Sequence, residues 1–387
     1  MTNTEVQYFA LLQAAIWDRP VAYEGAINWP EVMQLAQHHA TIILLCDVAS
    51  RMNDGRQPDM EMLEKMKQYM RSNLFFHIKL RQTMLQAVAM LRKQGIEPVL
   101  LKGFSLAALY PNPALRQFGD IDLFVGLEKF HEACAVLRAM PGSYNWGTIL
   151  DSGRHFNIEF GEYSLEIHRV SSEVLEAEEN AVYMELERQG LVINAEEVEL
   201  EGAHLRVPSK DFMAFFTFYH AWHHFLTTGV GWRQLCDIAM VLHTYHGQIN
   251  EEQLRRGLEG MHLMKPWQAF GVLLVQYLGL PESEMPFYTA KLHRTPQKLY
   301  SFIMREGNFG RHEDFKKKRP KNYLLRKAHA FICILVDFFR MYKVFPQVAF
   351  RELASSLKQG FTKVNHDIIG GGKKICKKSD FFLVYQK

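Results

Sequence analysis

The spacing of apolar residues divides the chain into helical and mixed regions. Through residues 1–95, apolar side chains recur at intervals of three and four, a period that predicts amphipathic helices. A clear run with this spacing is Val6, Phe9, Leu12 and Ile16. A long helix is predicted over residues 74–91, ending near Gly95. Short apolar runs and alternating segments then predict a mixed α/β region over residues 96–207.

The mixed region opens with a strand, a turn and a helix. Residues 99–101 (VLL) form an apolar run that ends at Lys102-Gly103, which predicts a short buried strand. Residues 105–110 predict the start of a helix, with Ser105 as its N-cap.

A second strand is predicted over residues 120–125 (DIDLFV). Because successive side chains of a strand alternate, Asp120 and Asp122 should point to the same side. Two carboxylates on one face of an apolar strand are costly to bury without a partner, and a divalent cation is the usual one. The alternative is a strand end at the surface, where both carboxylates are solvated.

Further elements follow the carboxylate strand. They are a helix over residues 127–140, strands over 147–150, 155–160 and 163–170, an acidic helix over 173–189, and a hairpin of 191–193 and 198–207 around Ala195-Glu196. The strands at 155–160 and 163–170 are expected to be joined by a tight turn at Gly161-Glu162.

The strand at 163–170 carries an acidic residue and a histidine among apolar residues. Glu166 and His168 share one face of this strand, whereas Leu165 and Ile167 take the other. The alternatives are a solvent-facing glutamate on an edge strand and an ordinary structural histidine. Glu159 and Glu162 are the other acidic residues nearby that could take the place of Glu166, and we interpret both as surface positions.

The helical period returns in the second half of the chain. Residues 211–225 predict a helix dense in Phe, Tyr, Trp and His. His220 and His224 are four apart and share a helical face, but the glutamate of an H-E-x-x-H zinc motif is missing, so a position between domains is favoured over a zinc site. Arg233 and Asp237, on the next predicted helix, have the spacing of an ion pair.

Composition and charge narrow the class of protein. Of 387 residues, 48% are hydrophobic and 12% aromatic, which indicates a globular chain. The net charge is +3, but residues 301–387 hold 19 Lys/Arg and 7 Asp/Glu, whereas the rest holds 26 and 35. This basic C-terminal region suggests contact with an anionic membrane surface or a protein partner, the alternative being a solvated basic surface.

Other expectations concern location and partners. The N-terminus lacks the pattern of a signal peptide, and the apolar run at residues 330–336 is too short to span a bilayer. The five cysteines form no C-x-x-C pair, which favours a reduced, cytoplasmic protein. The chain has no recognised nucleic-acid-binding motif, so nucleic acid is not an expected partner.

The order K-G-x-S, then Arg116, then G-D-I-D-L resembles the uncharacterised nucleotidyltransferase family of the DNA polymerase β-like superfamily. In that superfamily a strand leads into a glycine-containing turn and helix that hold a triphosphate, and later strands supply three metal-binding carboxylates. The resemblance implies an α+β fold, with a small mixed-sheet nucleotidyltransferase domain embedded between helical regions. The expected parts are a helical region over 1–95, the α/β domain over 96–207, a helical domain closing the cleft over 208–300, and a basic amphipathic helical region over 301–387.

The same resemblance implies Mg²⁺-dependent transfer of an NMP unit from an NTP to an unknown hydroxyl acceptor. Two Mg²⁺ ions would be held by Asp120, Asp122 and Glu166. Nucleotide contacts would come from Lys102, Gly103, Ser105, Arg116 and His168. The order H…WR…D also resembles the family, and it makes His220, His224, Arg233 and Asp237 candidate cleft residues.

Two other interpretations remain open. Lys102-Gly103 stands where the wider superfamily has Gly-Ser, which leaves room for a catalytically silent module that binds a nucleotide or a partner. Relatives of the family also occur in surface-polysaccharide and peptide-product biosynthesis, where a peripheral membrane protein would fit the basic C-terminal region.

Overall fold

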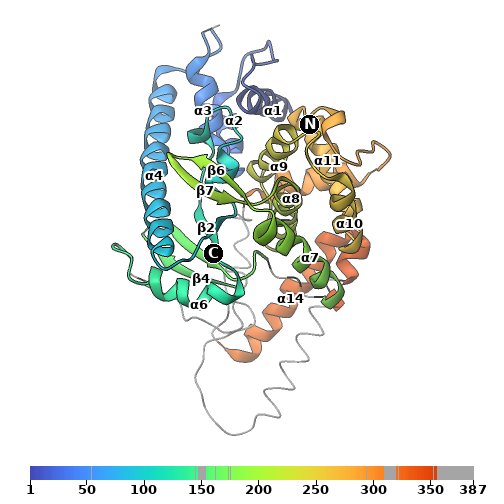
Figure 1. Ribbon diagram of the computed structural model, residues 1–387. Coiled ribbons are helices and arrows are strands. Elements are labelled where there is room, and N and C mark those ends of the chain that lie inside the picture. Colours follow the sequence, from blue (N-terminus) through green and yellow to red (C-terminus); the bar gives the residue numbers. More distant parts are fainter. Residues whose placement is uncertain are drawn as a thin grey trace.

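The computed structural model describes residues 1–354 except for 54, 144, 147–153, 162, 173, 175, 293, 309–319, 321 and 352. The predicted strand at 147–150, the competing residue Glu162 and most of the basic C-terminal region lie outside the described residues. Within them, one mixed sheet is flanked by helices that precede and follow it in the chain (Figure 1). This arrangement confirms the α+β fold class, whereas the four domain boundaries stay predictions.

Four helices precede the sheet. They are α1 (Asn3–Ile16), α2 (Trp29–His38), α3 (Ile42–Arg51) and α4 (Met60–Arg92). A capping box begins α1, since the Thr2 hydroxyl accepts from the Glu5 amide and the Glu5 carboxylate accepts from the Thr2 amide. The 33-residue helix α4 starts well before the predicted residue 74, because the Asp59 carboxylate caps it by accepting from the Met62 amide at 2.8 Å.

In the described residues, seven strands form one mixed sheet. They are β1 (Val99–Leu100), β2 (Asp120–Phe124), β3 (Asn145–Trp146), β4 (His155–Glu159), β5 (Ser164–His168), β6 (Glu196–Leu200) and β7 (Ala203–Val207). Their order is β3-β4-β5-β2-β1-β7-β6. Strand β2 pairs parallel with β5 and antiparallel with β1, and β1 pairs parallel with β7. The predicted carboxylate strand is therefore central in the sheet.

The two faces of the sheet pack against different parts of the chain. One face meets α4 and α6 (Gly126–Leu137) through a buried core that includes Ile121, Leu123, Leu165 and Ile167. The other face belongs to a larger core, which also contains residues of the helices before β1 and after β7. Its residues from the sheet region include Val99, Leu101, Phe124 and Val207. By alternation along β2, Asp120 and Asp122 lie on the face that carries Phe124.

The turn after β1 is built on Gly103. This residue has φ of 70°, a conformation that glycine adopts freely, and it is the N-cap of the short helix α5 (Phe104–Ala107). Ser105 lies inside that helix, so the prediction that it is the N-cap is wrong. The chain then passes through η1 (Pro113–Leu115) to reach β2.

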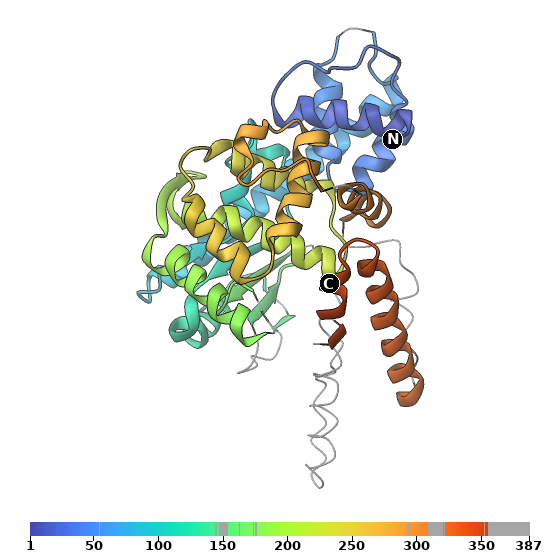
Figure 2. The same ribbon diagram turned by 90° about the vertical axis from the view of Figure 1, so that its right-hand side faces the viewer.

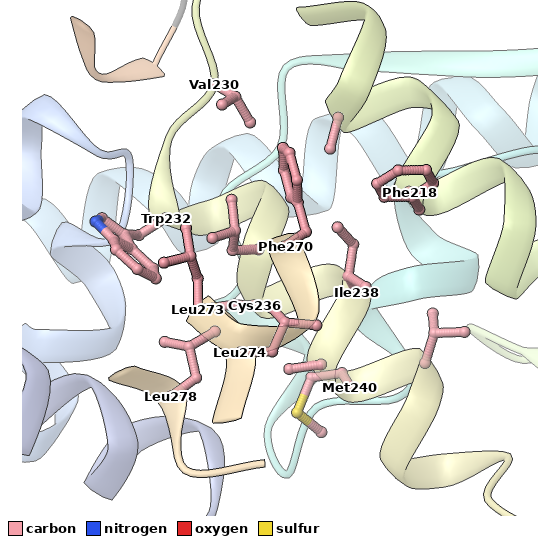
Figure 3. Packing of buried hydrophobic residues seen from close by; sticks show 14 of the residues in the cluster. Phe218, Val230, Trp232, Cys236, Ile238, Met240, Phe270, Leu273, Leu274 and Leu278 are labelled. Carbon is pink, nitrogen blue, oxygen red and sulfur yellow. The ribbon is translucent and has the colours of Figure 1, made fainter. Parts of the chain in front are cut away.

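A second group of helices follows β5 and β7. It comprises α7 (Ala177–Glu187), the π-helical turn η2 (Arg188–Ile193), α8 (Lys210–Thr227), α9 (Trp232–Thr244), α10 (Glu251–Gly260), α11 (Met264–Leu278), η3 (Glu282–Glu284) and α12 (Thr295–Glu306). Ser209 caps α8 by accepting from the Phe212 amide at 3.3 Å. Figure 3 shows how α8, α9 and α11 pack through Phe218, Trp232, Ile238, Phe270 and Leu274.

The segment after α7 differs from the prediction. Residues 191–193 belong to η2, and the hairpin consists of β6 and β7 with a turn at Glu201-Gly202. Both turn residues have positive φ, 53° and 75°, as in two-residue hairpin turns. A Cβ at Gly190 would lie 2.1 Å from the Cβ of Phe212, so glycine is what allows η2 to pack this closely on α8.

Beyond α12, helix α14 (Tyr323–Tyr342) extends away from the sheet (Figure 2). Several large apolar side chains on it are exposed: Leu325, Phe331, Ile332, Val336, Phe339 and Tyr342. Among the helices described here, none has both the length and the apolar character needed to cross a membrane.

Candidate functional site

The two aspartates of β2 sit where an apolar strand presents its polar face. Ile121 and Leu123 are buried against α4 and α6, which fixes the opposite orientation for Asp120 and Asp122. Asp122 is fully buried, whereas Asp120, at the start of the strand, is partly exposed. The hydrophobic pattern of β2 therefore places both carboxylates on the same side.

Strand β5 places the third predicted carboxylate beside them. In the parallel register of β2 and β5, Asp122 is opposite Glu166. Nε2 of His168 lies 2.9 Å from Oδ1 of Asp122 and 3.5 Å from Oε2 of Glu166. On the neighbouring strand β4, Asn157 donates to Oε1 of Glu166 at 3.4 Å. The sheet thus brings these polar groups from three strands onto one face.

This cluster has the donor atoms that a metal site needs. One possible ligand atom from each of Asp122, Glu166 and His168 lies within 4.8 Å of the others. Oδ2 of Asp122 is buried and has no hydrogen-bond partner in the described part of the chain. A buried carboxylate oxygen without a partner is costly, and a bound cation would satisfy it. The oxygen-rich donor set fits Mg²⁺.

The pKa values of the three predicted metal-binding carboxylates, Asp120, Asp122 and Glu166, are shifted in different directions. Burial raises the pKa of Asp120 to about 7, and the neighbouring charge of Asp122 adds to that effect. Burial alone would also raise the pKa of Asp122, but the charge of Lys102 and the hydrogen bond with His168 hold that pKa well below its usual range. For Glu166, burial is the largest effect and raises the pKa, but the hydrogen bond with His168 and the charges of His155 and His168 together outweigh it and lower the pKa to about 2. Asp122 and Glu166 are therefore ionised at neutral pH.

Lys102 connects the sheet to α8. Its Nζ lies 3.1 Å from Oδ1 of Asp122 and 3.4 Å from Nε2 of His220. Nε2 of His220 is in turn 3.0 Å from Nε2 of His224. Through this contact with Lys102, His220 on α8 lies beside the turn that follows β1.

The other two cleft candidates have separate partners. Arg116 donates to both carboxylate oxygens of Asp237, and Tyr110 donates to the same carboxylate at 2.8 Å. The predicted pairing of Arg233 with Asp237 is therefore wrong, because Arg116 from the loop before β2 takes the carboxylate. Arg233 instead donates to the backbone oxygen of Gln117 at 3.3 Å.

Arg233 keeps donor capacity near the carboxylates. Burial lowers its pKa, and the charge of Arg116 acts in the same direction, whereas Asp237 and Asp120 raise it. No ion pair of Arg233 occurs among the described residues, and a guanidinium has five N–H donors. An anionic ligand beside Asp120 would therefore find donors on Arg233 that the protein does not use.

Sequence reasoning missed two polar residues of β4. Asn157 contacts Glu166, and the His155 ring lies with its centroid 5.3 Å from that of His168. Both come from the predicted strand 155–160, whose alternation puts them on one face and Phe156 and Ile158 on the other. That alternation, together with the predicted tight turn between the strands at 155–160 and 163–170, was the available signal for placing Asn157 and His155 beside Glu166 and His168.

The comparison with curated proteins gives no match. Among solved structures, the antibiotic-resistance factor ANT(2'')-Ia matches at 17% identity and a TM-score of 0.34, covering 49% of this chain and 92% of that one. A family model described as an uncharacterised nucleotidyltransferase matches residues 25–279, well over half of the chain and all of the strands described above. The chain therefore belongs to this uncharacterised nucleotidyltransferase family.

Proposed function

We propose that the protein transfers an NMP unit from an NTP to a hydroxyl acceptor, with Mg²⁺ held by Asp120, Asp122 and Glu166. The observation that carries the proposal is the buried cluster of Asp122, Glu166 and His168, with its unpartnered carboxylate oxygen, inside the segment that matches the family. In the reaction, the acceptor oxygen bonds to the α-phosphorus while the bond from that phosphorus to the β-phosphate oxygen breaks. Pyrophosphate leaves, and the hydroxyl proton is released to solvent.

Mg²⁺ bound at this cluster would stabilise the charge that develops on the α-phosphate. The protein's own groups would orient the substrates. Gly103, with φ of 70°, allows the sharp turn that brings the backbone next to Asp120 of β2, and the backbone of this turn would approach the phosphates. Ser105 has a buried hydroxyl without a partner among the described residues, and it would contact the triphosphate.

Charged side chains would complete the nucleotide site. Arg233, with its unused donors, is the arginine that we favour for phosphate binding, ahead of Arg116, which is paired with Asp237. His168 would hold Asp122 and Glu166 in place by its hydrogen bonds to both carboxylates.

Nucleotide binding tests the proposal directly. Calorimetry with ATP, GTP, CTP and UTP, each with and without Mg²⁺, would compare the natural protein with the Asp120→Asn/Asp122→Asn double variant. We expect Mg²⁺-dependent binding of at least one NTP and its loss in the variant. Binding that is equally strong without Mg²⁺ or in the variant would contradict the assignment of the carboxylates.

A catalytically silent nucleotide-binding module is the competing function. It would bind the same NTP but release no pyrophosphate. Mixing the NTP identified above with candidate sugars, small metabolites, peptides and proteins, and measuring pyrophosphate, separates the two. Release that requires both Mg²⁺ and an acceptor supports the enzyme.

A peripheral contact with an anionic membrane is a second candidate activity. The exposed apolar residues of α14 favour it, since Phe331 and Phe339 are 50% and 59% exposed. The net positive charge of residues 301–387 complements anionic lipid headgroups. An apolar helix face together with basic residues is typical of helices that lie in a membrane interface.

A further inference from the structure

Lys102 occupies a fixed place between a carboxylate of the site and α8. Its ammonium nitrogen is 3.1 Å from Oδ1 of Asp122 and 3.4 Å from Nε2 of His220, and its side chain is only 14% exposed. A lysine side chain is long and flexible in solvent. Here its two contacts and its burial restrict the ammonium to one position.

The histidines of α8 form a directed hydrogen-bond relay behind Lys102. An ammonium can only donate, so Nε2 of His220 accepts and the proton of that ring lies on Nδ1. Nε2 of His224, 3.0 Å away, then donates to the same Nε2 of His220, which becomes a shared acceptor. Nδ1 of His224 is left to accept from the Thr228 hydroxyl at 2.8 Å. With these tautomers, the single lone pair on Nε2 of His220 is shared between the ammonium of Lys102 and the N–H of His224, and His224 accepts from Thr228.

The environment keeps both rings uncharged, as this relay requires. Burial lowers the pKa of His220 well below its usual value, and the charge of Lys102 lowers it further. Burial likewise lowers the pKa of His224, with smaller effects from His223 and Lys102. A protonated His220 would repel the ammonium, whereas the neutral ring accepts from it.

The contacts of Asp122 limit how many cations this carboxylate can bind. A carboxylate that bridges two metal ions uses one oxygen for each ion. Oδ1 of Asp122 already accepts from Lys102 and from His168, at 3.1 and 2.9 Å. Only Oδ2 is without a partner among the described residues. A second divalent cation on Oδ1 would meet the positive charge of Lys102 at short range.

We propose that the ammonium of Lys102 takes the place of one of the two cations of a two-metal site, so that the site holds a single Mg²⁺. This inference rests on the proposed function and replaces the two ions that the family resemblance implied. The ammonium of Lys102 places one positive charge beside Oδ1 of Asp122, where the second cation would otherwise bind. His220, His224 and Thr228 are positioning residues for Lys102. The single Mg²⁺ would bind Oδ2 of Asp122 together with Glu166 and Asp120.

Electron paramagnetic resonance of bound Mn²⁺ counts the ions without requiring turnover. Two Mn²⁺ ions about 4 Å apart, the usual spacing of a two-metal site, give an exchange-coupled spectrum, whereas a single ion gives an isolated hyperfine pattern. The full-length protein would be saturated with Mn²⁺ and an α,β-methylene NTP analogue and freed of excess metal. We expect the isolated pattern for the natural protein and the coupled spectrum for Lys102→Met.

Control variants keep this test specific. Lys129→Met removes an exposed lysine of α6, paired with Glu132, and should leave the isolated pattern unchanged. Lys102→Gln is a second neutral variant in case Lys102→Met fails to fold, which circular dichroism would reveal. A coupled spectrum in the natural protein, or an isolated pattern in both folded Lys102 variants, would overturn the inference.

The same Mn²⁺ spectrum tests whether His220 positions Lys102. His220→Leu removes the acceptor that holds Lys102, and we expect part of the population to show the coupled spectrum. His220→Gln keeps an acceptor oxygen and should restore the isolated pattern, a rescue that a merely structural role would not require. If His220→Leu gives the natural spectrum, His220 does not position Lys102.

The outcomes also separate this inference from the proposed function. A natural protein that binds neither Mn²⁺ nor any of the four NTP analogues would overturn both. A natural protein that binds a coupled pair of Mn²⁺ ions would overturn the single-cation site alone, and the proposed nucleotidyl transfer would stand.

Discussion

Arg116 donates to both carboxylate oxygens of Asp237, from Nε at 2.7 Å and from Nη2 at 2.8 Å. Each side chain is only 5% exposed, and the two residues are 121 positions apart in the sequence. The pair fastens the loop before β2 to α9. The position of Asp120, four residues after Arg116, therefore depends on a contact with the helical half of the protein.

Removing one partner of this pair should be strongly destabilising. Asp237→Ala leaves the buried guanidinium of Arg116 without its countercharge, and we expect the free energy of unfolding to fall by about 3–5 kcal/mol. Denaturant unfolding measures the change. The double variant Arg116→Met/Asp237→Leu removes both charges and should recover a large part of the loss. Equal losses in the single and double variants would show that the ion pair is not the cause.

The carboxylate cluster makes a prediction about activity. Asp122→Asn and Glu166→Gln should each reduce the rate of NTP-dependent transfer by at least ~100-fold, since metal binding contributes several kcal/mol to such reactions. Glu159→Gln is the matched control, because Glu159 competed with Glu166 in the sequence and lies at the far end of β4. Circular dichroism would verify that each variant is folded. If Glu166→Gln kept natural activity and Glu159→Gln lost it, Glu159 and not Glu166 would be the metal-binding carboxylate.

Gly190 is expected to tolerate no side chain. A Cβ there would lie 2.1 Å from the Cβ of Phe212, so Gly190→Ala forces η2 away from α8. We expect a loss of about 1–3 kcal/mol or more in the free energy of unfolding, the usual cost of overpacking. Gly119→Ala is the control, because a Cβ at Gly119 has no neighbour within 4 Å. Similar denaturation midpoints for the two variants would contradict the close packing of η2.

The buried ring of His39 predicts a dependence of stability on pH. His39 is fully buried among neighbours that include His38 and Tyr8, and burial, followed by the charge of His38, lowers its pKa well below 6.5. Below pH 6.5 the unfolded chain binds a proton at this ring and the folded protein does not. Stability is therefore fully present above pH 6.5 and falls as the pH drops, by up to ~1.4 kcal/mol per pH unit from this group.

Replacing the ring isolates its share of the effect. His39→Phe should flatten the plot of unfolding free energy against pH between 6.5 and 5, whereas His204→Gln, at an exposed position, should leave its slope unchanged. An unaltered slope in His39→Phe would mean that other buried histidines dominate.

The exposed face of α14 predicts binding to anionic vesicles. The full-length protein should sediment with vesicles of anionic phospholipid at low salt and less at high salt, because screening weakens attraction to the headgroups. Phe331→Ser/Phe339→Ser should reduce this binding. Phe75→Ser removes a side chain of α4 that is 68% exposed, and it serves as the control. If the α14 variant and the Phe75→Ser control sedimented equally with the vesicles, α14 would not be the membrane-binding element.

The parts of the structure that depend on local sequence were predictable. The apolar residues around Gly103, and the alternation in β2 and β5, identified the strand–turn–helix and the faces that carry Asp122 and Glu166. The hairpin turn was misplaced because Glu201-Gly202, a pair suited to positive φ, was read as part of a strand. The start of α4 was missed because the Asp59 cap precedes a weakly apolar stretch.

The partners of the site residues could not be predicted in this way. Asp122 faces Glu166 because β5 pairs with β2 in one register, which a single sequence does not reveal. Likewise, spacing on a helix suggested Asp237 as the partner of Arg233, but tertiary packing gives it to Arg116. The contact of Lys102 with His220 joins residues 118 positions apart, and no local pattern reports it.

The short strand β1 has a consequence for synthesis on the ribosome. β1 pairs with β2 on one side and with β7 on the other, and β7 emerges about a hundred residues after β1. Until then, a nascent sheet of β1, β2, β4 and β5 would leave the β1 edge open. Open edges are templates for aggregation, and very short edge strands limit it. With only two residues in β1, that edge offers little length for a second chain to pair with before the β6–β7 hairpin covers it.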